Sequence, residues 1–243
     1  MYSEIKTVLH VDDQEMMRDL VEFGFEDTGV KFVSASSFDE CVNRLKSLKP
    51  DVILLDALLG DMDGVDLADK ISAQYKGLQV IFISALDEKT IFTKGKPNNV
   101  LGVISKPFIP KKLPSQVAQL LNQEIHNTGC RLHNKNLTLE NNRLSELKLK
   151  YQQHLKDSVI RDIEYLWSNL QSKKNDEKIL DKLVLELHKV SGTAGIHNLT
   201  TISKTAALLE NKFRDFKNNT SMANLIDEGN ELYCSLKNKI NQL

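Results

Sequence analysis

The chain is poor in the residues that mark several common protein classes. Of its 243 residues only three are cysteines, Cys41, Cys130 and Cys234. They are odd in number, lie far apart and lack the spacing of metal ligands, which argues against a disulfide scaffold and against a zinc-finger type of site. Prolines and glycines number only five and eleven, and there is no low-complexity tract, so the sequence does not predict disorder. The cysteine pattern is typical of a reducing compartment, and we expect a cytoplasmic protein.

An excess of charge of one sign and long apolar runs are also missing. The formal net charge of −1 gives no electrostatic basis for binding nucleic acid or an acidic membrane surface. No apolar run approaches the roughly 20 residues that a membrane helix requires, and the first residues lead into a strand-like run without a signal peptide. We therefore expect neither nucleic acid nor a membrane as a partner. The composition, 41% hydrophobic and 27% charged, is that of a soluble protein with one large domain or two ordinary ones.

The first half of the chain alternates between two patterns. Short apolar runs that are typical of buried strands are separated by helix-like stretches from residue 5 to about residue 126. The runs are 7–11, 31–33, 51–55, 79–83 and 100–105. Continuous apolar strands that alternate with helices predict a doubly wound, five-stranded parallel sheet covered on both faces. The fourth helix is expected to be weak, because the residues after Leu86 are soon interrupted by Gly95 and Pro97.

Polar side chains stand where these strands end, and they are Asp12, Asp13, Asp56, Ser84 and Lys106. In parallel sheets ligands bind at the carboxyl ends of the strands. Three carboxylates in one place would repel one another, and a hard divalent cation such as Mg²⁺ relieves that repulsion while leaving room for phosphate oxygens. A lysine and a hydroxyl can hold the remaining oxygens of a phosphoryl group. The set therefore predicts in-line phosphoryl transfer onto a carboxylate.

This pattern resembles the receiver domain of bacterial response regulators over the full length of that domain. The matching positions are the acid pair Asp12-Asp13, the acceptor Asp56, the hydroxyl Ser84, Lys106 before Pro107, and Asp63-Gly64. The resemblance implies a flavodoxin-like fold and a domain that promotes its own phosphorylation on Asp56. It also implies that the Lys106–Pro107 peptide bond is cis.

The resemblance further implies a Mg²⁺ site with a defined set of ligands. Asp13 and Asp56 are expected to bind the ion directly, with Asp12 in the same cluster. The backbone carbonyl of Leu58, two residues after the acceptor, is the further expected ligand. Ser84 and Lys106 are then the groups that hold the phosphoryl oxygens.

A proline-free and glycine-free stretch from residue 131 to about residue 170 predicts a long helix. Leu137, Leu144 and Tyr151 lie seven residues apart, which allows a short coiled coil and a homodimer through residues 131–156. The alternative is an extended first helix that packs within its own chain. We expect three parts, namely a receiver domain over 1–127, a helical linker over 128–156 and a helical domain over 157–243.

The most informative helix of the second half contains His188. Its apolar stripe is formed by Leu180, Leu183, Val184, Leu187 and Val190. His188 lies at the border of this stripe, and Gly192 and Gly195 lie on its face one and two turns on. Glycines cost a helix about 1 kcal/mol each, and here they remove side chains from around the imidazole. An accessible imidazole is a nucleophile or a ligand, and a half-buried structural histidine is the other interpretation that this helix leaves open.

Residues 157–243 resemble the histidine phosphotransfer (HPt) domain, an antiparallel four-helix bundle. The matching segments are His188-Lys189-Val190-Ser191-Gly192-Thr193-Ala194 and Ala207-Leu208-Leu209-Glu210. The resemblance implies that His188 carries a phosphoryl group, with Lys189, Ser191, Gly192 and Gly195 around it. Ser191 departs from the family, which commonly has a lysine there, so a positive charge near the phosphoryl group is missing. The helix that follows is expected to begin at the capping residue Asn198.

Together the two resemblances predict a two-component phosphorelay protein. Asp56 would receive phosphate from a sensor histidine kinase or another phosphodonor, and His188 would exchange phosphate with the receiver domain of another response regulator. No glycine-rich ATP site follows His188, so the chain is not expected to be a kinase. Two alternatives stay open. Phosphorylation of Asp56 could control the exposure of the helical domain or dimerisation without transfer, or the helical domain could be an inert interaction domain.

Overall fold

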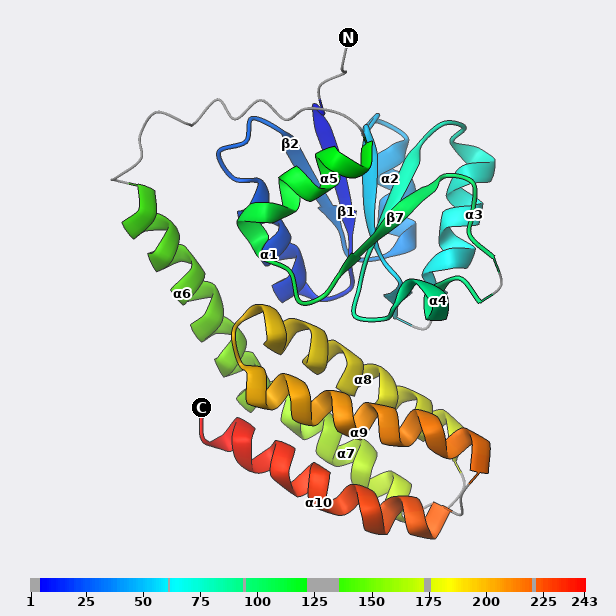
Figure 1. Ribbon diagram of the computed structural model, residues 1–243, viewed down its shortest axis with the longest axis vertical. Helices are drawn as coiled ribbons and strands as arrows, with labels where there is room; N and C mark the ends of the chain where they lie inside the picture. Colours follow the sequence, from blue (N-terminus) through cyan, green and yellow to red (C-terminus); the bar gives the residue numbers. More distant parts are fainter. Residues whose placement is uncertain (1–4, 61, 94, 122–135, 173–175, 220–221) are drawn as a thin grey trace. The chain divides into compact units, whose positions relative to one another are not determined.

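The computed structural model describes residues 5–60, 62–93, 95–121, 136–172, 176–219 and 222–243. The chain divides into two compact units, residues 1–141 and residues 142–243 (Figure 1). The boundary that we expected between residues 127 and 128 lies outside the described residues. Each unit has its own buried core, and the two are described separately.

The first unit is built on a parallel sheet with the strand order β2-β1-β3-β6-β7. Its strands are β1 (Thr7–Val11), β2 (Lys31–Ala35), β3 (Val52–Asp56), β6 (Gln79–Ser84) and β7 (Val100–Ser105). All four neighbouring pairs are parallel. The expected doubly wound sheet is therefore confirmed, and its central strands β1 and β3 bring the residues that follow them to one edge.

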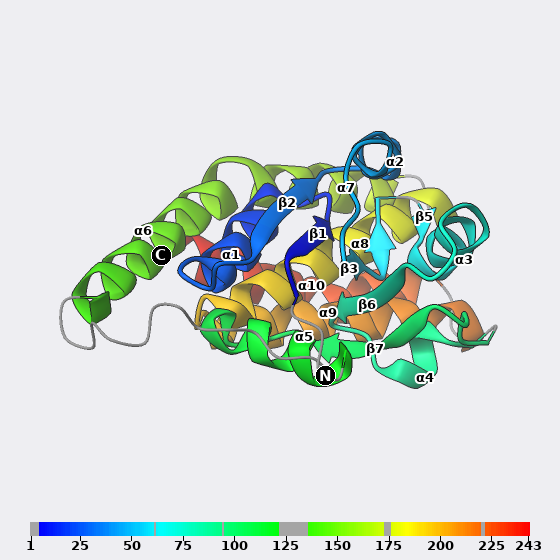
Figure 2. The same cartoon turned by 90° about the horizontal axis from the view of Figure 1, so that it is seen from above.

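Helices cover both faces of this sheet (Figures 1 and 2). They are α1 (Glu15–Phe25), α2 (Phe38–Leu45), α3 (Gly64–Gln74), α4 (Glu88–Ile91) and α5 (Leu113–Leu121), with a 3₁₀ turn η1 (Pro110–Lys112) before α5. The fourth helix is only four residues long, as expected. Asp87 caps it through the amide of Thr90, and Gly95 takes a left-handed φ of 108° soon after it.

A short hairpin follows Asp56. Its two strands, β4 (Leu58–Leu59) and β5 (Met62–Asp63), pair antiparallel with Leu58 opposite Asp63. Asp63 then caps α3 by accepting from the amide of Val65 at 2.9 Å. The hairpin fixes the chain directly beside the acceptor aspartate.

The second unit is helical. It contains the C-terminal part of α6 (Asn136–His154), then α7 (Ile160–Ser172), α8 (Glu177–Ile196), α9 (Thr200–Asn219) and α10 (Met222–Asn241), with a π-helical turn (Leu155–Val159) between α6 and α7. Helices α7 to α10 lie side by side (Figure 1). Fully or nearly fully buried side chains from α7 to α10 form the core, among them Trp167, Leu183, Leu187, Phe213 and Leu236. The predicted helical bundle is thus present in α7 to α10.

Helix α6 packs within this unit more extensively than the sequence suggested. Leu147, Tyr151 and Leu155 are 3%, 3% and 0% exposed, so one face of the helix is buried. The compact unit consequently begins at Asn142, earlier than the start at residue 157 that we expected, and the second half of the expected linker 128–156 belongs to it. Tyr151, one of the proposed coiled-coil positions, is used inside the chain.

Asn198 ends a helix instead of beginning one, which corrects the predicted cap. It takes a left-handed φ of 59° two residues after Ile196, the last residue of α8. Its amide donates to the carbonyl of Gly195 at 3.2 Å, and the amide of Leu199 donates to that of Ala194 at 2.9 Å. This pattern closes helices at a left-handed residue, a position that asparagine tolerates better than most residues.

His197, which precedes Asn198, is a buried histidine. Its ring is 3% exposed and stacks on Tyr151 at 4.7 Å between centroids. Within the described part of the chain neither ring nitrogen has a hydrogen-bond partner. Burial, aided by the charge of Lys148, lowers the pKa of His197 to about 4.

The second unit should therefore lose stability as the pH falls from about 6.5 to about 4. In this pH range His197 is protonated in the unfolded chain but stays neutral in the folded chain. The free energy of unfolding should therefore fall by up to about 3 kcal/mol. The fluorescence of Trp167, the single tryptophan of the chain, would report urea unfolding of this unit at each pH. Replacing His197 with phenylalanine should flatten the pH dependence, whereas replacing the exposed His154 with glutamine should not. An equal dependence in all three proteins would contradict this assignment.

Candidate functional site

The three aspartates that the sequence singled out meet at one edge of the sheet. Asp12 follows β1 and Asp56 ends β3, and these strands pair in register with Val11 opposite Leu55. One carboxylate oxygen from each of Asp12, Asp13 and Asp56 lies within 4.8 Å of the others. Asp12 and Asp56 are 0% and 3% exposed. The sheet register thus creates a buried acidic cluster at the carboxyl ends of the strands.

Lys106 closes this cluster from the end of β7. Its Nζ lies 2.9 Å from Oδ2 of Asp56 and 3.4 Å from Oδ2 of Asp12. Its amide donates to the carbonyl of Ser84 at 2.7 Å, and its bond to Pro107 is cis as expected. Burial alone would disfavour the ammonium, but the two carboxylates outweigh burial and raise the pKa of Lys106 above its usual range.

The two buried carboxylates differ in charge balance. Burial raises the pKa of Asp12, and the Lys106 ammonium only partly opposes this. Burial acts in the same direction on Asp56, but there Lys106 outweighs it and holds the pKa below the usual range. One ammonium is therefore too little positive charge for three acids. A cluster of carboxylate oxygens in need of positive charge suits a hard divalent cation such as Mg²⁺.

Ser84 and Leu58 stand beside the strand end that carries Asp56. Ser84 ends β6, the neighbour of β3, and its fully buried Oγ accepts from the amide of Leu86 at 3.1 Å. The amide of Leu58 donates to Oδ1 of Asp56 at 3.1 Å. This bond fixes the orientation of the acceptor carboxylate. The role of the Leu58 carbonyl as a metal ligand stays a prediction.

Two residues beside the cluster were not identified from the sequence. His10 in β1 is fully buried, and its Nε2 lies 3.9 Å from Oδ2 of Asp12. Burial, followed by the charge of Lys106, lowers the pKa of His10 to about 3, so the ring is neutral. Arg18 in α1 donates through Nη1 to the carbonyl of Asp12 at 2.7 Å. The available signal for His10 was a polar residue in an apolar strand, on the same side as Asp12 two positions on.

His188 is less accessible than the sequence suggested. It lies on α8 with only 6% of its surface exposed. Its Nδ1 is 2.9 Å from Oε1 of Glu210 on α9, a residue that is itself 5% exposed. The same oxygen accepts from Nε of Arg214 at 2.9 Å. The expectation of an open imidazole is wrong, because α9 packs against α8 and supplies a carboxylate partner.

This partner determines which nitrogen of His188 can react. A carboxylate accepts hydrogen bonds, so we assign the ring hydrogen to Nδ1, and the lone pair of the neutral ring is then on Nε2. Arg214 pairs with Glu210 and balances its charge. The guanidinium of Arg214 therefore brings a positive charge near the imidazole through Glu210. Ser191 replaces the lysine that was expected to supply such a charge.

The other residues expected around His188 make contacts within α8 or with α9. Lys189 pairs with Glu186 on its own helix at 3.5 Å. The carbonyl of Ser191 accepts from Oγ of Ser203 on α9 at 2.7 Å. Gly192 is buried and Gly195 is partly buried. The Ser203–Ser191 bond links α9 to α8, and Glu210 bonds the imidazole directly.

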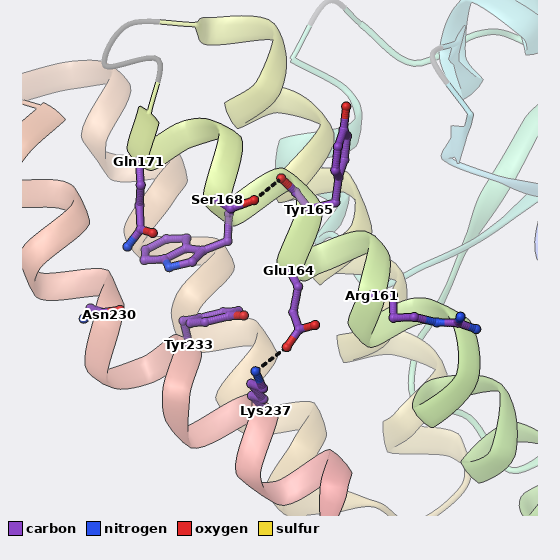
Figure 3. A pocket seen from close by; sticks show the side chains of 9 residues that line it. Arg161, Glu164, Tyr165, Ser168, Gln171, Asn230, Tyr233 and Lys237 are labelled. Carbon is purple, nitrogen blue, oxygen red and sulfur yellow. Dashed lines mark hydrogen bonds and ion pairs between the residues drawn. The ribbon is translucent and has the colours of Figure 1, made fainter.

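A surface groove between α7 and α10 lies outside this histidine site (Figure 3). Its lining includes Arg161, Glu164, Tyr165, Trp167, Ser168, Gln171, Asn230, Tyr233 and Lys237. The Trp167 ring stacks on Tyr233 at 5.0 Å and on Phe213 at 5.6 Å, and Glu164 pairs with Lys237. Glu164, Lys237 and the rings of Trp167 and Tyr233 are thus engaged in these contacts, and we assign no chemistry to the groove.

Comparisons with known proteins identify the first unit. The family model described as response regulator receiver domain matches residues 8–118. The chain is 28% identical over 116 residues to the alkaline phosphatase synthesis transcriptional regulatory protein PhoP of Bacillus subtilis, which covers 48% of each chain. It is 29% identical over 118 residues to the phosphate regulon transcriptional regulatory protein PhoB of Escherichia coli, which covers 48% of this chain and 52% of that protein. The chain thus spans about half the length of these curated relatives.

Among solved structures, the receiver domain of NtrX from Brucella abortus is 27% identical. It covers 48% of this chain and 99% of that chain with a TM-score of 0.44. The matching family model ends at residue 118, before the second unit begins. The interpretation of the second unit therefore rests on its own residues and geometry.

Proposed function

Because residues 8–118 are a response regulator receiver domain, we propose that the chain is a two-component phosphorelay protein in which Asp56 and His188 each carry a phosphoryl group. The observation that supports this most is the second site. A buried imidazole is held through Nδ1 by Glu210 at 2.9 Å, in the same chain as an acidic cluster closed by Lys106. The first site provides a carboxylate oxygen and the second an imidazole nitrogen. Each of these nucleophiles can accept a phosphoryl group from the phosphorylated form of the other type.

At the first site, an Oδ atom of Asp56 attacks the phosphorus of a phosphohistidine on a sensor histidine kinase or of a small acyl phosphate. The bond between phosphorus and the donor breaks, the donor keeps the electron pair, and an acyl phosphate forms on Asp56. Lys106 and Ser84 hold the phosphoryl oxygens. Asp12, Asp13, Asp56 and the Leu58 carbonyl are the residues that would hold Mg²⁺, which supplies positive charge against the acids and the phosphoryl group.

At the second site, Nε2 of His188 attacks the phosphorus of a phosphoaspartate on a receiver domain, such as that of another response regulator. The bond from phosphorus to the aspartate oxygen breaks, and the carboxylate leaves with the electron pair. Nδ1–H stays with Glu210, so the positive charge that develops on the ring is met by a carboxylate. The phosphoramidate that forms is a high-energy donor for the reverse step.

Replacing Glu210 with alanine should slow phosphoryl transfer to His188 by roughly 10- to 100-fold. A charge-assisted hydrogen bond contributes about 1.5–3 kcal/mol, and its loss frees the ring to rotate and to change tautomer. The rate of label transfer from a phosphorylated receiver domain would measure this effect. Glu210→Gln, which keeps an acceptor oxygen, should lose less. Glu228→Ala, which removes only a surface partner of Lys212, should keep the wild-type rate, and a wild-type rate in Glu210→Ala would contradict the role of Glu210.

The burial of His188 favours one second candidate function. At 6% exposure, the imidazole offers little surface to a partner, so phosphorylation of Asp56 could act by changing its exposure without transfer in the chain. Label on His188 that requires Asp56 of the same chain would indicate an internal relay. Label on His188 regardless of Asp56 would indicate independent modules.

The remaining partners follow from charge and burial. We propose no contact with nucleic acid by this chain, since its formal net charge is only −1, although the relatives PhoP and PhoB are named as transcriptional regulatory proteins. The homodimer through residues 131–156 stays a proposal, supported by the partly exposed Leu144. The burial of Tyr151 supports the alternative, in which this helix packs within its own chain. In the part of the chain that the structure describes, no helix has the length and apolar character to cross a membrane.

A further inference from the structure

His10 is a polar residue in a place that an apolar side chain would fill at lower cost. It lies in β1 with no exposed surface, and the Phe32 ring on β2 is 6.1 Å from its own. Among the described residues, neither Nδ1 nor Nε2 has a hydrogen-bond partner. A neutral imidazole always carries one N–H, and a buried donor without an acceptor destabilises the fold. The resting state of the site therefore gives no reason for this histidine.

The nearest polar atom is part of the acidic cluster. Nε2 of His10 lies 3.9 Å from Oδ2 of Asp12, on the same side of β1. That oxygen is also 3.4 Å from Nζ of Lys106, whose shorter contact, 2.9 Å, is to Asp56. The other oxygen of Asp12, Oδ1, accepts from the amide of Gln14 at 2.9 Å. Oδ2 of Asp12 thus shares a lysine that the proposed phosphoryl transfer also needs.

We infer that His10 is a positioning residue for Asp12. The Nε2–H of His10 holds the Asp12 carboxylate when Lys106 turns to a phosphoryl oxygen. This inference rests on the proposed function of the first unit. The 3.9 Å separation must shorten by about 1 Å to reach hydrogen-bond length. Arg18 already binds the backbone carbonyl of Asp12 at 2.7 Å, so a rotation of the carboxylate achieves this while the backbone stays fixed.

A direct role of His10 as a metal ligand does not fit the geometry. Oxygens of Asp12, Asp13 and Asp56 all lie within 4.8 Å of one another, and no nitrogen of His10 belongs to this group. His10 therefore acts on the cluster through Asp12. Residues that orient metal ligands in this way typically change metal affinity by 10- to 100-fold when they are replaced.

The test compares His10→Val with His10→Gln in the full chain. Mg²⁺ is titrated calorimetrically in the absence and in the presence of beryllofluoride, a phosphoryl analogue that engages Lys106. His10→Val should weaken Mg²⁺ binding roughly 10- to 100-fold with beryllofluoride and less without it. His10→Gln, whose amide can donate from a similar position, should recover most of the loss.

Thermal unfolding without metal distinguishes positioning from simple packing. In the presence of a chelator, His10→Val should unfold at a higher temperature than the wild type, because it removes an unsatisfied buried donor. His197 is the matched control, since it is also buried and, among the described residues, its ring nitrogens also have no hydrogen-bond partner. His197→Val should leave Mg²⁺ binding unchanged.

Three results would overturn the inference. The first is unchanged Mg²⁺ affinity in His10→Val, and the second is equal weakening by valine and glutamine. The third is a loss of metal-free stability in His10→Val, which would make the ring a packing element. A wild-type chain that binds no Mg²⁺ would instead overturn the proposed function of the first unit, and the inference with it.

Discussion

Replacing Asp56 with asparagine is expected to abolish phosphorylation of the first unit. The amide lacks the nucleophilic oxygen charge that attacks phosphorus, and it also removes the main partner of Lys106 at 2.9 Å. Loss of a covalent nucleophile typically costs a thousandfold or more, roughly, in rate. Incubation with labelled acetyl phosphate and Mg²⁺ would measure the result as label that hydroxylamine releases, since acyl phosphates are cleaved by it.

The control for this variant is Asp87→Asn. Asp87 is an exposed cap of α4, bonded to the amide of Thr90 at 2.8 Å, and asparagine caps helices equally well. This protein should be labelled as the wild type is. Because Asp56→Asn removes one of several crowded acids, it should also fold. Hydroxylamine-labile phosphate on folded Asp56→Asn would show that another residue is the acceptor.

Replacing His188 with glutamine is expected to remove all phosphate from the second unit. This phosphate is recognised because it survives alkali and is lost in acid. Such stability is characteristic of phosphohistidine. Glutamine can still meet Glu210, so the packing of α8 on α9 should persist, but it has no nitrogen with a nucleophilic lone pair. The measurement is the alkali-stable label that the chain acquires from a phosphorylated receiver domain. We expect a loss of at least roughly a thousandfold.

His154 provides the matched histidine for this experiment. It lies exposed at the end of α6, so His154→Gln should keep the alkali-stable label. Unfolding followed by the fluorescence of Trp167 would show that both variants retain the bundle. If the label instead disappeared with His154, or persisted in His188→Gln, the assignment of the second acceptor would be wrong.

The first site was predictable from the sequence because it depends on a local rule. Strands that alternate with helices pair in parallel, and residues directly after such strands share one edge. Asp12, Asp56 and Lys106 could therefore be brought together without knowledge of side-chain packing. The side of β1 on which His10 lies follows from the same alternation, but its lack of a partner depends on neighbouring strands and helices.

The second site was only half predictable, because its decisive contact is not local. Glu210 is 22 residues from His188 and meets it only through the pairing of α8 with α9. The same pairing buries the imidazole, which a single helix pattern could not reveal. Asn198 shows a related difficulty, since asparagine is favoured both at the start of a helix and in the left-handed position that ends one.

The claim that one chain carries phosphate on both Asp56 and His188 is tested most directly by a mixing experiment. The Asp56→Asn chain, which keeps His188, is incubated with phosphorylated receiver domains. These are the His188→Gln chain labelled on Asp56 and labelled receivers of other response regulators from the same cell. The account predicts that alkali-stable label appears on the Asp56→Asn chain and maps to His188. If none of the phosphorylated receivers transfers label to His188, the second unit is not a phosphotransfer domain and the account is contradicted.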